Sequence, residues 1–345
     1  MATGPASLPA GKLPNELLAQ LLARVAHRDP RVLIGPAVGR DAAVIDTGAP
    51  KLLVAKTDPV TFATDLIGWY AVHVNANDIA CLGAWPAWFL ASVLLPENCP
   101  ADLPGEILSQ LSQACDALGI ELIGGHTEIT YRLDRPIVVG AMLGEVERDR
   151  LITGERARPG DAVILTKGIA IEGTAVLARE AGPVLLARGA SEQTVARAAD
   201  YLTDPGISIV LDAAAACDAV PVHAMHDPTE GGLATALYEL AAACSCGVSV
   251  DADSINIFPE TQAICAAAGL DPFGLLASGA LLLVVPDKNA GAATAALWEA
   301  GVSARRIGSL QTPADGVIMA VNGESRPVPR FDRDEAARFL SGLPD

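Results

Sequence analysis

The sequence predicts an α/β protein of two domains, and three observations support this prediction. The chain has 345 residues, which corresponds to about two domains at roughly 150 residues per domain. Half of it (51%) is apolar and only 19% is charged, so it can bury a sizeable core and is not disordered. Short apolar runs alternate with segments of helical periodicity, and the runs are numerous enough for one large sheet or a barrel.

The first half opens with a helix and continues with strands and two further helices. Leu17, Leu18, Leu21 and Leu22 recur at helical spacing after Pro14. The later apolar runs are bounded by turn residues, as strands are. The expected helices are 15–27, 67–82 and 103–118, and the expected strands are 42–45, 52–57, 88–95, 120–123 and 137–146.

The second half begins after a turn at 156–160 and is richer in helices. We expect strands at 161–166 and 281–285, and helices at 172–180, 190–216 (broken at Asp204), 233–244, 260–268 and 289–300. The chain then divides into an N-terminal helical extension (1–36), a first domain (37–153), a second domain (154–325) and a tail with a short helix (326–345).

Composition excludes several classes of partner. The chain has 24 basic and 41 acidic residues, a net charge of −17 and a pI near 4.6. It therefore lacks the basic face that nucleic acid or an anionic membrane would need. Residues 1–11 lack the features of a signal peptide, and no apolar stretch is long enough to span a bilayer. The seven irregularly spaced cysteines fit a reducing compartment, so we expect a cytoplasmic protein.

Common catalytic motifs are absent from the sequence. It has no Walker lysine loop, no Gly-x-Gly-x-x-Gly, no Gly-x-Ser-x-Gly and no His-Glu-x-x-His. His223, His226, Cys244 and Cys246 suggest zinc, but one residue between the two cysteines is too few for a standard structural site.

Four isolated aspartates are the informative pattern. Asp41 lies at the mouth of one apolar strand, Asp58 follows another, and Asp78 interrupts the apolar stripe of a helix. A buried carboxylate needs a cation or several hydrogen-bond donors. The alternatives are turn acids at strand ends for Asp41 and Asp58, and a carboxylate bonded to backbone at a helix end for Asp78.

Two glycine pairs accompany these acids. Asp227 precedes Pro228 and Glu230, which resembles a capping box, but Gly231 and Gly232 are poor helix formers and favour close approach of backbone to a ligand.

The other pair, Gly124 and Gly125, ends a predicted strand before His126 and Thr127, and can present amide groups to an anion; an ordinary turn is the alternative. Carboxylates for Mg²⁺ and glycines for phosphate together describe a nucleotide site without a P-loop.

Five ordered segments carry a family resemblance, and they cover most of the chain from about residue 11 to 285. They are Gly-Pro-Ala-Val-Gly-Arg-Asp-Ala-Ala-Val (35–44), Lys-Thr-Asp (56–58), Asn-Asp-Ile-Ala-Cys-Leu-Gly-Ala (77–84), Gly-Gly-His-Thr (124–127) and Asp-Pro-Thr-Glu-Gly-Gly-Leu (227–233). The chain resembles the aminoimidazole ribonucleotide (AIR) synthetase-like, or PurM-like, superfamily, and within it the hydrogenase-maturation HypE-like branch.

The resemblance implies a two-domain α/β fold of the α+β type and a homodimer whose N-terminal sheets combine into a β-barrel. It implies ATP in a cleft between the domains, near the dimer seam, and use of the γ-phosphate to activate a substrate atom. The implied Mg²⁺ ligands are Asp41, Asp58, Asp78 and Asp227. The implied nucleotide contacts are Lys56, Gly124, Gly125, Thr127, Gly231 and Gly232.

The sequence also departs from the family pattern. Arg40 stands where relatives often have a second acid, so that a metal ligand is missing or Arg40 contacts phosphate. His126 replaces an acid, and is either a general base or substrate contact, or a structural histidine. The last cysteine is Cys265, so the C-terminal cysteine of the maturation protein is absent. Selenophosphate synthetases use an N-terminal cysteine or selenocysteine, and here no cysteine precedes Cys81, which disfavours that activity.

The leading hypothesis is therefore an ATP- and Mg²⁺-dependent enzyme that phosphorylates or dehydrates a small molecule. One alternative is a nucleotide-binding maturation or scaffold protein that docks another protein. A second alternative is a small-molecule kinase of the thiamine monophosphate kinase type.

Overall fold

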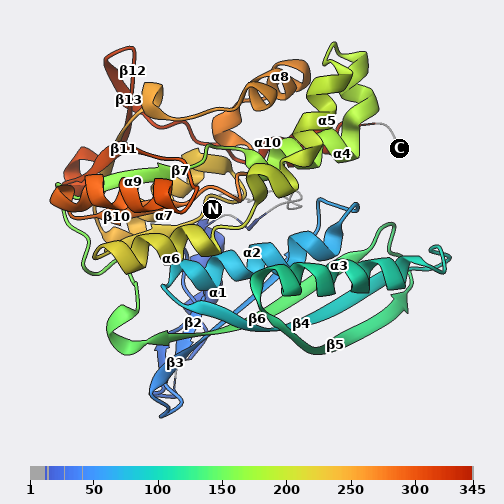
Figure 1. Ribbon diagram of the computed structural model, residues 1–345, viewed down its shortest axis with the longest axis horizontal. Helices are drawn as coiled ribbons and strands as arrows, with labels where there is room; N and C mark the ends of the chain where they lie inside the picture. The colour runs from blue at the N-terminus through green and yellow to red at the C-terminus, as the bar shows by residue number, and fades with distance from the viewer. Residues whose placement is uncertain (1–11, 14, 27, 41, 344–345) are drawn as a thin grey trace, which may run out of the picture.

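The computed structural model describes residues 12–13, 15–26, 28–40 and 42–343, and it confirms the expected α/β fold. Figure 1 shows a six-stranded sheet with two helices on one face, and above it a seven-stranded sheet with the remaining large helices. Both sheets are mixed, because each contains one parallel pair among antiparallel ones.

The six-stranded sheet has the order β1-β2-β3-β6-β4-β5. Its strands are β1 (Val32–Ile34), β2 (Ala43–Ile45), β3 (Lys51–Val60), β4 (Trp85–Pro96), β5 (Glu121–Thr130) and β6 (Ile137–Glu147), and its helices are α1 (Asn15–Leu22), α2 (Ile67–Cys81) and α3 (Leu103–Leu118). The two long helices and the strands β2, β3, β4 and β6 lie where the sequence predicts them, β5 begins there but runs further, and β1 was not predicted.

Helix α2 approaches the first sheet closely because two glycines of β6 leave room for it. A Cβ atom at Gly140 would lie 2.3 Å from Asn75 Nδ2, and one at Gly144 would lie 2.4 Å from Ile79 Cγ2. Contacts this short would force the Asn75 and Ile79 side chains, or the helix itself, to move. The two glycines therefore set the distance between α2 and the strands on which the site residues lie.

Strand β5 differs from its prediction. It does not end before Gly124 but continues through both glycines to Thr130, pairing in parallel with β4. The register shifts by one residue at Ile123, between Phe89 and Leu90 of β4. This bulge keeps the strand paired beyond the glycines. β5 forms one edge of the sheet, and most of its residues are exposed.

The seven-stranded sheet has the order β13-β12-β9-β11-β7-β10-β8. Its strands are β7 (Ala162–Thr166), β8 (Ala224–His226), β9 (Gly247–Asp251), β10 (Leu282–Val285), β11 (Ala304–Gln311), β12 (Val317–Val321) and β13 (Glu324–Pro327), and the helices of this half are α4 (Ile171–Ala187), α5 (Glu192–Asp200), α6 (Val210–Ala219), α7 (Gly232–Cys244), α8 (Pro259–Ala268), α9 (Ala290–Glu299) and α10 (Glu335–Leu340). The central strands β7 and β10 are buried along their whole length.

Asn77 joins the two halves of the molecule. Its side chain lies on α2, is fully buried, donates a hydrogen bond to the carbonyl of Ile207 at 2.8 Å and accepts one from the amide of Ile209 at 2.9 Å. Both partners belong to the segment that leads into α6, which lies beside α2 in Figure 1. Two buried hydrogen bonds thus fix the second half relative to the helix that carries Asp78.

The six-stranded sheet is open within the single chain, with β1 and β5 at its edges. The barrel formed across two chains therefore stays a prediction. Among the helices that the structure describes, none combines the length and the apolar character needed to cross a membrane.

Candidate functional site

A cleft between the two halves is lined by two of the predicted site residues. Its volume is about 600 Å³, open mouth included. Asp58 and Asp78 line it from the first half, and Glu172, Glu230 and Ser278 line it from the second. The remaining walls are largely apolar. A concave site with a few convergent polar groups between two structural units is the usual form of a small-molecule site.

Lys56 is not among the residues that line the cleft, but it pairs with both aspartates of its acidic part, Asp58 and Asp78. Its Nζ lies 2.8 Å from Asp78 Oδ2 and 3.6 Å from Asp58 Oδ2. The alternation along β3 places Lys56 and Asp58 on the face of the sheet that α2 covers, where Asp78 projects toward them. The structure thus brings together three residues that the sequence predicts for one nucleotide site.

The burial of Asp78 has a clear electrostatic reason. The residue is only 4% exposed, within a helix that is almost entirely buried. A carboxylate in such surroundings is tolerated only when a cation or several donors accompany it. The ammonium of Lys56 supplies that cation.

Asp58 is held in place at the end of β3 through its backbone. Asn75 of α2 donates from Nδ2 to the Asp58 carbonyl at 3.2 Å and to the Ala71 carbonyl at 2.8 Å. The Asp58 side chain is 42% exposed and points into the cleft. Its backbone is therefore fixed while its carboxylate stays accessible to a ligand.

Asp227 is buried in the loop between β8 and α7. It is 1% exposed, and the thiol of Cys81, which follows Asp78 on α2 by three residues, lies 3.4 Å from its Oδ1. The capping-box interpretation is wrong, because α7 begins at Gly232 and its N-cap is Gly231. Asp227 therefore lies near the helix that carries Asp78 rather than capping its own helix.

The amides of Gly231 and Gly232 already have protein partners. The Gly231 amide donates to Asp334 Oδ2 at 2.7 Å, and the Gly232 amide donates to the Thr229 carbonyl at 3.0 Å. A Cβ atom at Gly232 would lie 2.5 Å from the Phe273 carbonyl oxygen. In this conformation the glycine pair serves close packing, and its contact with a nucleotide stays a prediction.

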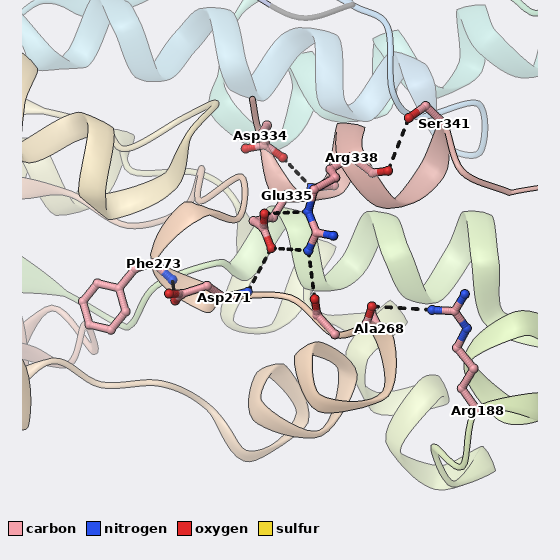
Figure 2. A network of polar contacts seen from close by, with 10 residues as sticks. Arg188, Ala268, Asp271, Phe273, Asp334, Glu335, Arg338 and Ser341 are labelled. Atoms are coloured by element: carbon pink, nitrogen blue, oxygen red, sulfur yellow. Dashed lines mark hydrogen bonds and ion pairs between the residues drawn. The ribbon is translucent and has the colours of Figure 1, made fainter. Parts of the chain in front are cut away.

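The C-terminal helix α10 fixes Asp334. Figure 2 shows Arg338 donating to both oxygens of Glu335, at 2.8 and 2.7 Å. Glu335 Oε2 also accepts from the Asp271 amide at 3.0 Å. Burial raises the pKa of Asp334 to about 6, although the amides of Gly231 and Ala336 oppose this shift.

The residues of the second glycine pair lie on β5 and do not line the cleft. Gly125 must be glycine because a Cβ atom there would lie 2.0 Å from the Ala91 carbonyl oxygen of β4. His126 is 66% exposed in its side chain, and its Nε2 lies 3.0 Å from Glu128 Oε2. Thr127 follows it on the same exposed strand. Within one chain, the structure does not bring these residues to Lys56.

Of the first predicted motif, the structure describes Arg40 but not Asp41. Asp41 lies outside the described residues. Its neighbour Arg40 is exposed and donates to the Gly35 carbonyl at 3.4 Å.

The zinc candidates have other partners. His223 Nδ1 lies 2.7 Å from Asp161 Oδ2, and His226 Nε2 lies 3.0 Å from Glu239 Oε2. Across the described part of the chain, no three His, Cys, Asp or Glu side chains are arranged to hold a metal ion.

Three residues of the cleft were not predicted: Lys12, Glu172 and Glu230. Lys12 donates from Nζ to Thr229 Oγ1 at 2.9 Å and from its amide to Glu230 Oε2 at 3.2 Å. Burial raises the pKa of Glu230, and the charge of Lys12 opposes that shift. Glu172 is an isolated acid in an apolar, glycine-containing segment, which is the signal that singled out the four aspartates.

Comparison with known proteins gives consistent results over most of the chain. Models of the AIR synthase related protein family match residues 39–146 (N-terminal domain) and 158–320 (C-terminal domain). Carbamoyl dehydratase HypE of Rhodobacter capsulatus is 31% identical over 264 residues, which cover 74% of this chain and 74% of that protein.

Two solved structures are also similar. A crystal structure of hydrogenase maturation protein HypE in complex with ATP has 25% identity and a TM-score of 0.67, covering 93% of this chain and 91% of that one. A HypE–HypF complex has 22% identity and a TM-score of 0.70, covering 85% of this chain and 94% of that one, and this likeness concerns the fold alone.

Proposed function

The chain belongs to the AIR synthase related protein family, and on that premise we propose that it is an ATP- and Mg²⁺-dependent enzyme. It transfers the γ-phosphate of ATP to an oxygen of a small molecule, or uses it to activate that oxygen. The observation that carries the proposal is the pairing of Lys56 with Asp58 and Asp78, the two aspartates that line the cleft.

The residues present suit a magnesium nucleotide. Mg²⁺ in nucleotide sites is commonly held by one or two carboxylates together with phosphate oxygens. Asp58 and Asp78 supply two such carboxylates, and Asp227 and Asp41 are the further candidates. When bound, Mg²⁺ would neutralise phosphate charge.

The chain's own residues would perform the remaining work of phosphoryl transfer. This reaction needs mainly positioning and charge stabilisation. Lys56 binds a phosphate oxygen through its ammonium, which already lies between two carboxylates and is fixed by them. The apolar walls of the cleft keep the acceptor oxygen away from bulk water. The HypE structure in complex with ATP supports a nucleotide in this family.

The fate of the nucleotide tests this proposal. Incubation with Mg²⁺ and ATP, followed by ³¹P NMR, should give ADP, and more of it when the proper acceptor is added. The γ-phosphate should appear as a phosphate ester of the acceptor if it is transferred, or as inorganic phosphate if the activated oxygen is expelled. Asp78→Asn should abolish the reaction, because it removes the carboxylate that positions Lys56. Release of AMP and pyrophosphate, or equal turnover by the variant, would contradict the proposed use of the γ-phosphate.

We further propose a homodimer formed through the first sheet. Alternate residues of β6, including Val139 and Leu143, point away from α2 and are only half-buried. β5 adds an exposed edge with Ile123 and Ile129 at 50% and 65% exposure. An exposed apolar face with an open strand edge usually has a partner. In such a dimer, His126 and the β5 glycines would reach a nucleotide only across the interface.

A protein-docking role is the second candidate, favoured by the same half-buried face. The HypE–HypF complex shows that a protein of this fold can dock another protein. A chain with this role would bind nucleotide but would not consume it when small molecules are added. The ³¹P NMR experiment therefore separates the two candidates.

A further inference from the structure

One part of the cleft, here called its inner end, is lined by Glu172 and Ser278 and contains polar atoms that the proposed phosphate chemistry does not use. Glu172 is 6% exposed, Ser278 is 1% exposed, and both line the cleft. Among the residues that the structure describes, neither Glu172 Oε2 nor Ser278 Oγ has a hydrogen-bond partner of good geometry, although the hydroxyl is close enough to the carboxyl to lower its pKa. Buried polar atoms are nearly always bonded, so an unsatisfied pair facing a cavity indicates a ligand.

The position of Glu172 is fixed by the fold. It lies in the first turn of α4, and its amide donates to the Ser278 carbonyl at 3.3 Å. The next residue, Gly173, packs directly on the segment that carries Ser278, because a Cβ atom there would lie 2.7 Å from the Leu276 carbonyl oxygen. The carboxyl and the hydroxyl are therefore held side by side at the cleft wall.

The charges around Glu172 indicate what kind of ligand would fit. Burial raises the pKa of Glu172 to about 8; the Ser278 hydroxyl lowers it, while the carboxylates of Asp334, Glu230 and Asp227 raise it further. The strongest charges acting on this carboxyl are thus all negative. A cation at this point would relieve the repulsion and supply the missing hydrogen bonds.

Elsewhere at the same cleft, ammonium groups of the chain itself already bind to acidic and hydroxyl side chains. Near its acidic part, Lys56 pairs with Asp78, and Lys12 donates to Thr229 beside Glu230. Both are ammonium groups carried on hydrocarbon stems. The inner end has an acid beside a hydroxyl, as Glu230 and Thr229 do, and the apolar side chains of Val176 and Leu276 also line the cleft. Such walls suit a hydrocarbon body that ends in a compact cation.

We propose that Glu172 and Ser278 form a subsite for an alkylammonium group of the substrate. The ammonium would donate to the Glu172 carboxylate and to the Ser278 hydroxyl, while the hydrocarbon part lies on the apolar walls. This inference rests on the proposed function, since it assigns the inner end of the cleft to the phosphate acceptor and the acidic part to the magnesium nucleotide. The substrate class is then a small aliphatic amine that also carries the oxygen to be phosphorylated.

The test uses two matched probes in the absence of nucleotide, so that it does not depend on the ATP site. Butylammonium and 1-butanol have nearly the same shape and differ in charge. Their binding to the full chain can be followed by saturation-transfer NMR at millimolar concentrations. Butylammonium should bind the native protein at least tenfold more tightly than butanol. Equal binding of the two, or no binding of either, would overturn the proposal.

Variants locate the binding. At pH 9, above the pKa of Glu172, Glu172→Gln keeps the shape but removes the charge, and should weaken butylammonium binding about tenfold without affecting butanol. Ser278→Ala should weaken it to a smaller extent. Glu192→Gln, an equal charge change at an exposed position of α5 outside the cleft, should have no effect. Butylammonium binding that survives Glu172→Gln unchanged would place the amine at other acids and refute the subsite.

Failure of the subsite and failure of the proposed function give different results. If the subsite is wrong but the enzyme assignment is right, Mg²⁺-dependent consumption of ATP persists while the native protein treats butylammonium and butanol alike. If the enzyme assignment is wrong, ATP is not consumed, whatever the amine result.

Discussion

Replacing Glu172 by Gln should change how the stability of the protein depends on pH. Burial raises the pKa of this carboxyl from its usual 4.5 to about 8 in the folded state. Between these values the folded state binds one more proton at Glu172 than the unfolded state does. Stability therefore falls as pH rises through this window. The full loss corresponds to about 3.5 pKa units at 1.36 kcal/mol per unit, or about 5 kcal/mol.

Gln cannot titrate and has nearly the shape of the protonated acid. At pH 5 the variant and the native protein should unfold with nearly equal free energies. At pH 7 the variant should be more stable by about 3 kcal/mol, and the difference should grow by up to about 1.4 kcal/mol per pH unit below pH 8. Other titrating groups, such as His73, whose pKa burial lowers to about 4, cancel in this comparison.

Urea denaturation at pH 5, 6, 7 and 8 measures this difference, provided that circular dichroism and fluorescence report coincident transitions. Glu192→Gln on exposed α5 is the control, and its pH profile should parallel that of the native protein. Parallel profiles for Glu172→Gln would refute the reasoning, because they would show that the buried carboxyl keeps its ordinary pKa.

Three further predictions address packing, domain contact and β5. Gly144→Ala should lower the free energy of unfolding by about 1–3 kcal/mol, because its Cβ would lie 2.6 Å from the Trp85 carbonyl oxygen. The control Gly105→Ala has open space around it on α3 and should raise the free energy of unfolding by up to about 1 kcal/mol. Calorimetric melting measures both changes. Asn77→Ala should cost about 2–3 kcal/mol, because two buried backbone groups lose their partner, and intact stability in urea would contradict this. His126→Ala should leave the melting temperature unchanged, because the ring is exposed. If His126 is the general base, the rate of ATP turnover should fall about 100-fold. An unchanged rate would show that His126 has no catalytic role.

The first half of the fold was largely predictable from local patterns. The helices α2 and α3 and the strands β3 and β6 have clear periodicity and appear within a few residues of the expected bounds. Strand β5 was cut short because a glycine pair normally ends a strand. Here Gly125 is required within it, since the β4 backbone passes too close to this position for any side chain.

The second half was harder to predict, and five of its strands were missed. β11 (Ala304–Gln311) carries two arginines and no alternation of apolar residues, and β8 (Ala224–His226) is too short to stand out. Their strand conformation comes from pairing with β7 and β10, which are distant in sequence. Such tertiary pairing leaves little trace in a local pattern. The four-part division of the chain stays a prediction.

The acids of the site also show that contacts between distant parts of the chain cannot be predicted from local patterns. Asp58 and Asp78 could be selected from sequence because each is an isolated carboxylate in an apolar setting. Glu172 has the same signature but was not predicted as a site residue; the sequence indicated it only as the first residue of the helix expected at 172–180. Only the spatial arrangement shows that it faces the same cleft as Asp58 and Asp78. The contribution of Lys12 depends on a contact with Thr229 across 217 positions, which no spacing rule reveals.

Lys56, Asp58 and Asp78 are proposed to bind a magnesium nucleotide. Calorimetric titration of the native protein with ATP, with and without Mg²⁺, measures this binding, with Asp78→Asn as the matched variant. We expect saturable binding that requires Mg²⁺, and a loss of at least tenfold in affinity for Asp78→Asn with its cooperative melting preserved. Absence of binding at any Mg²⁺ concentration, or metal-independent binding that the variant retains in full, would contradict it.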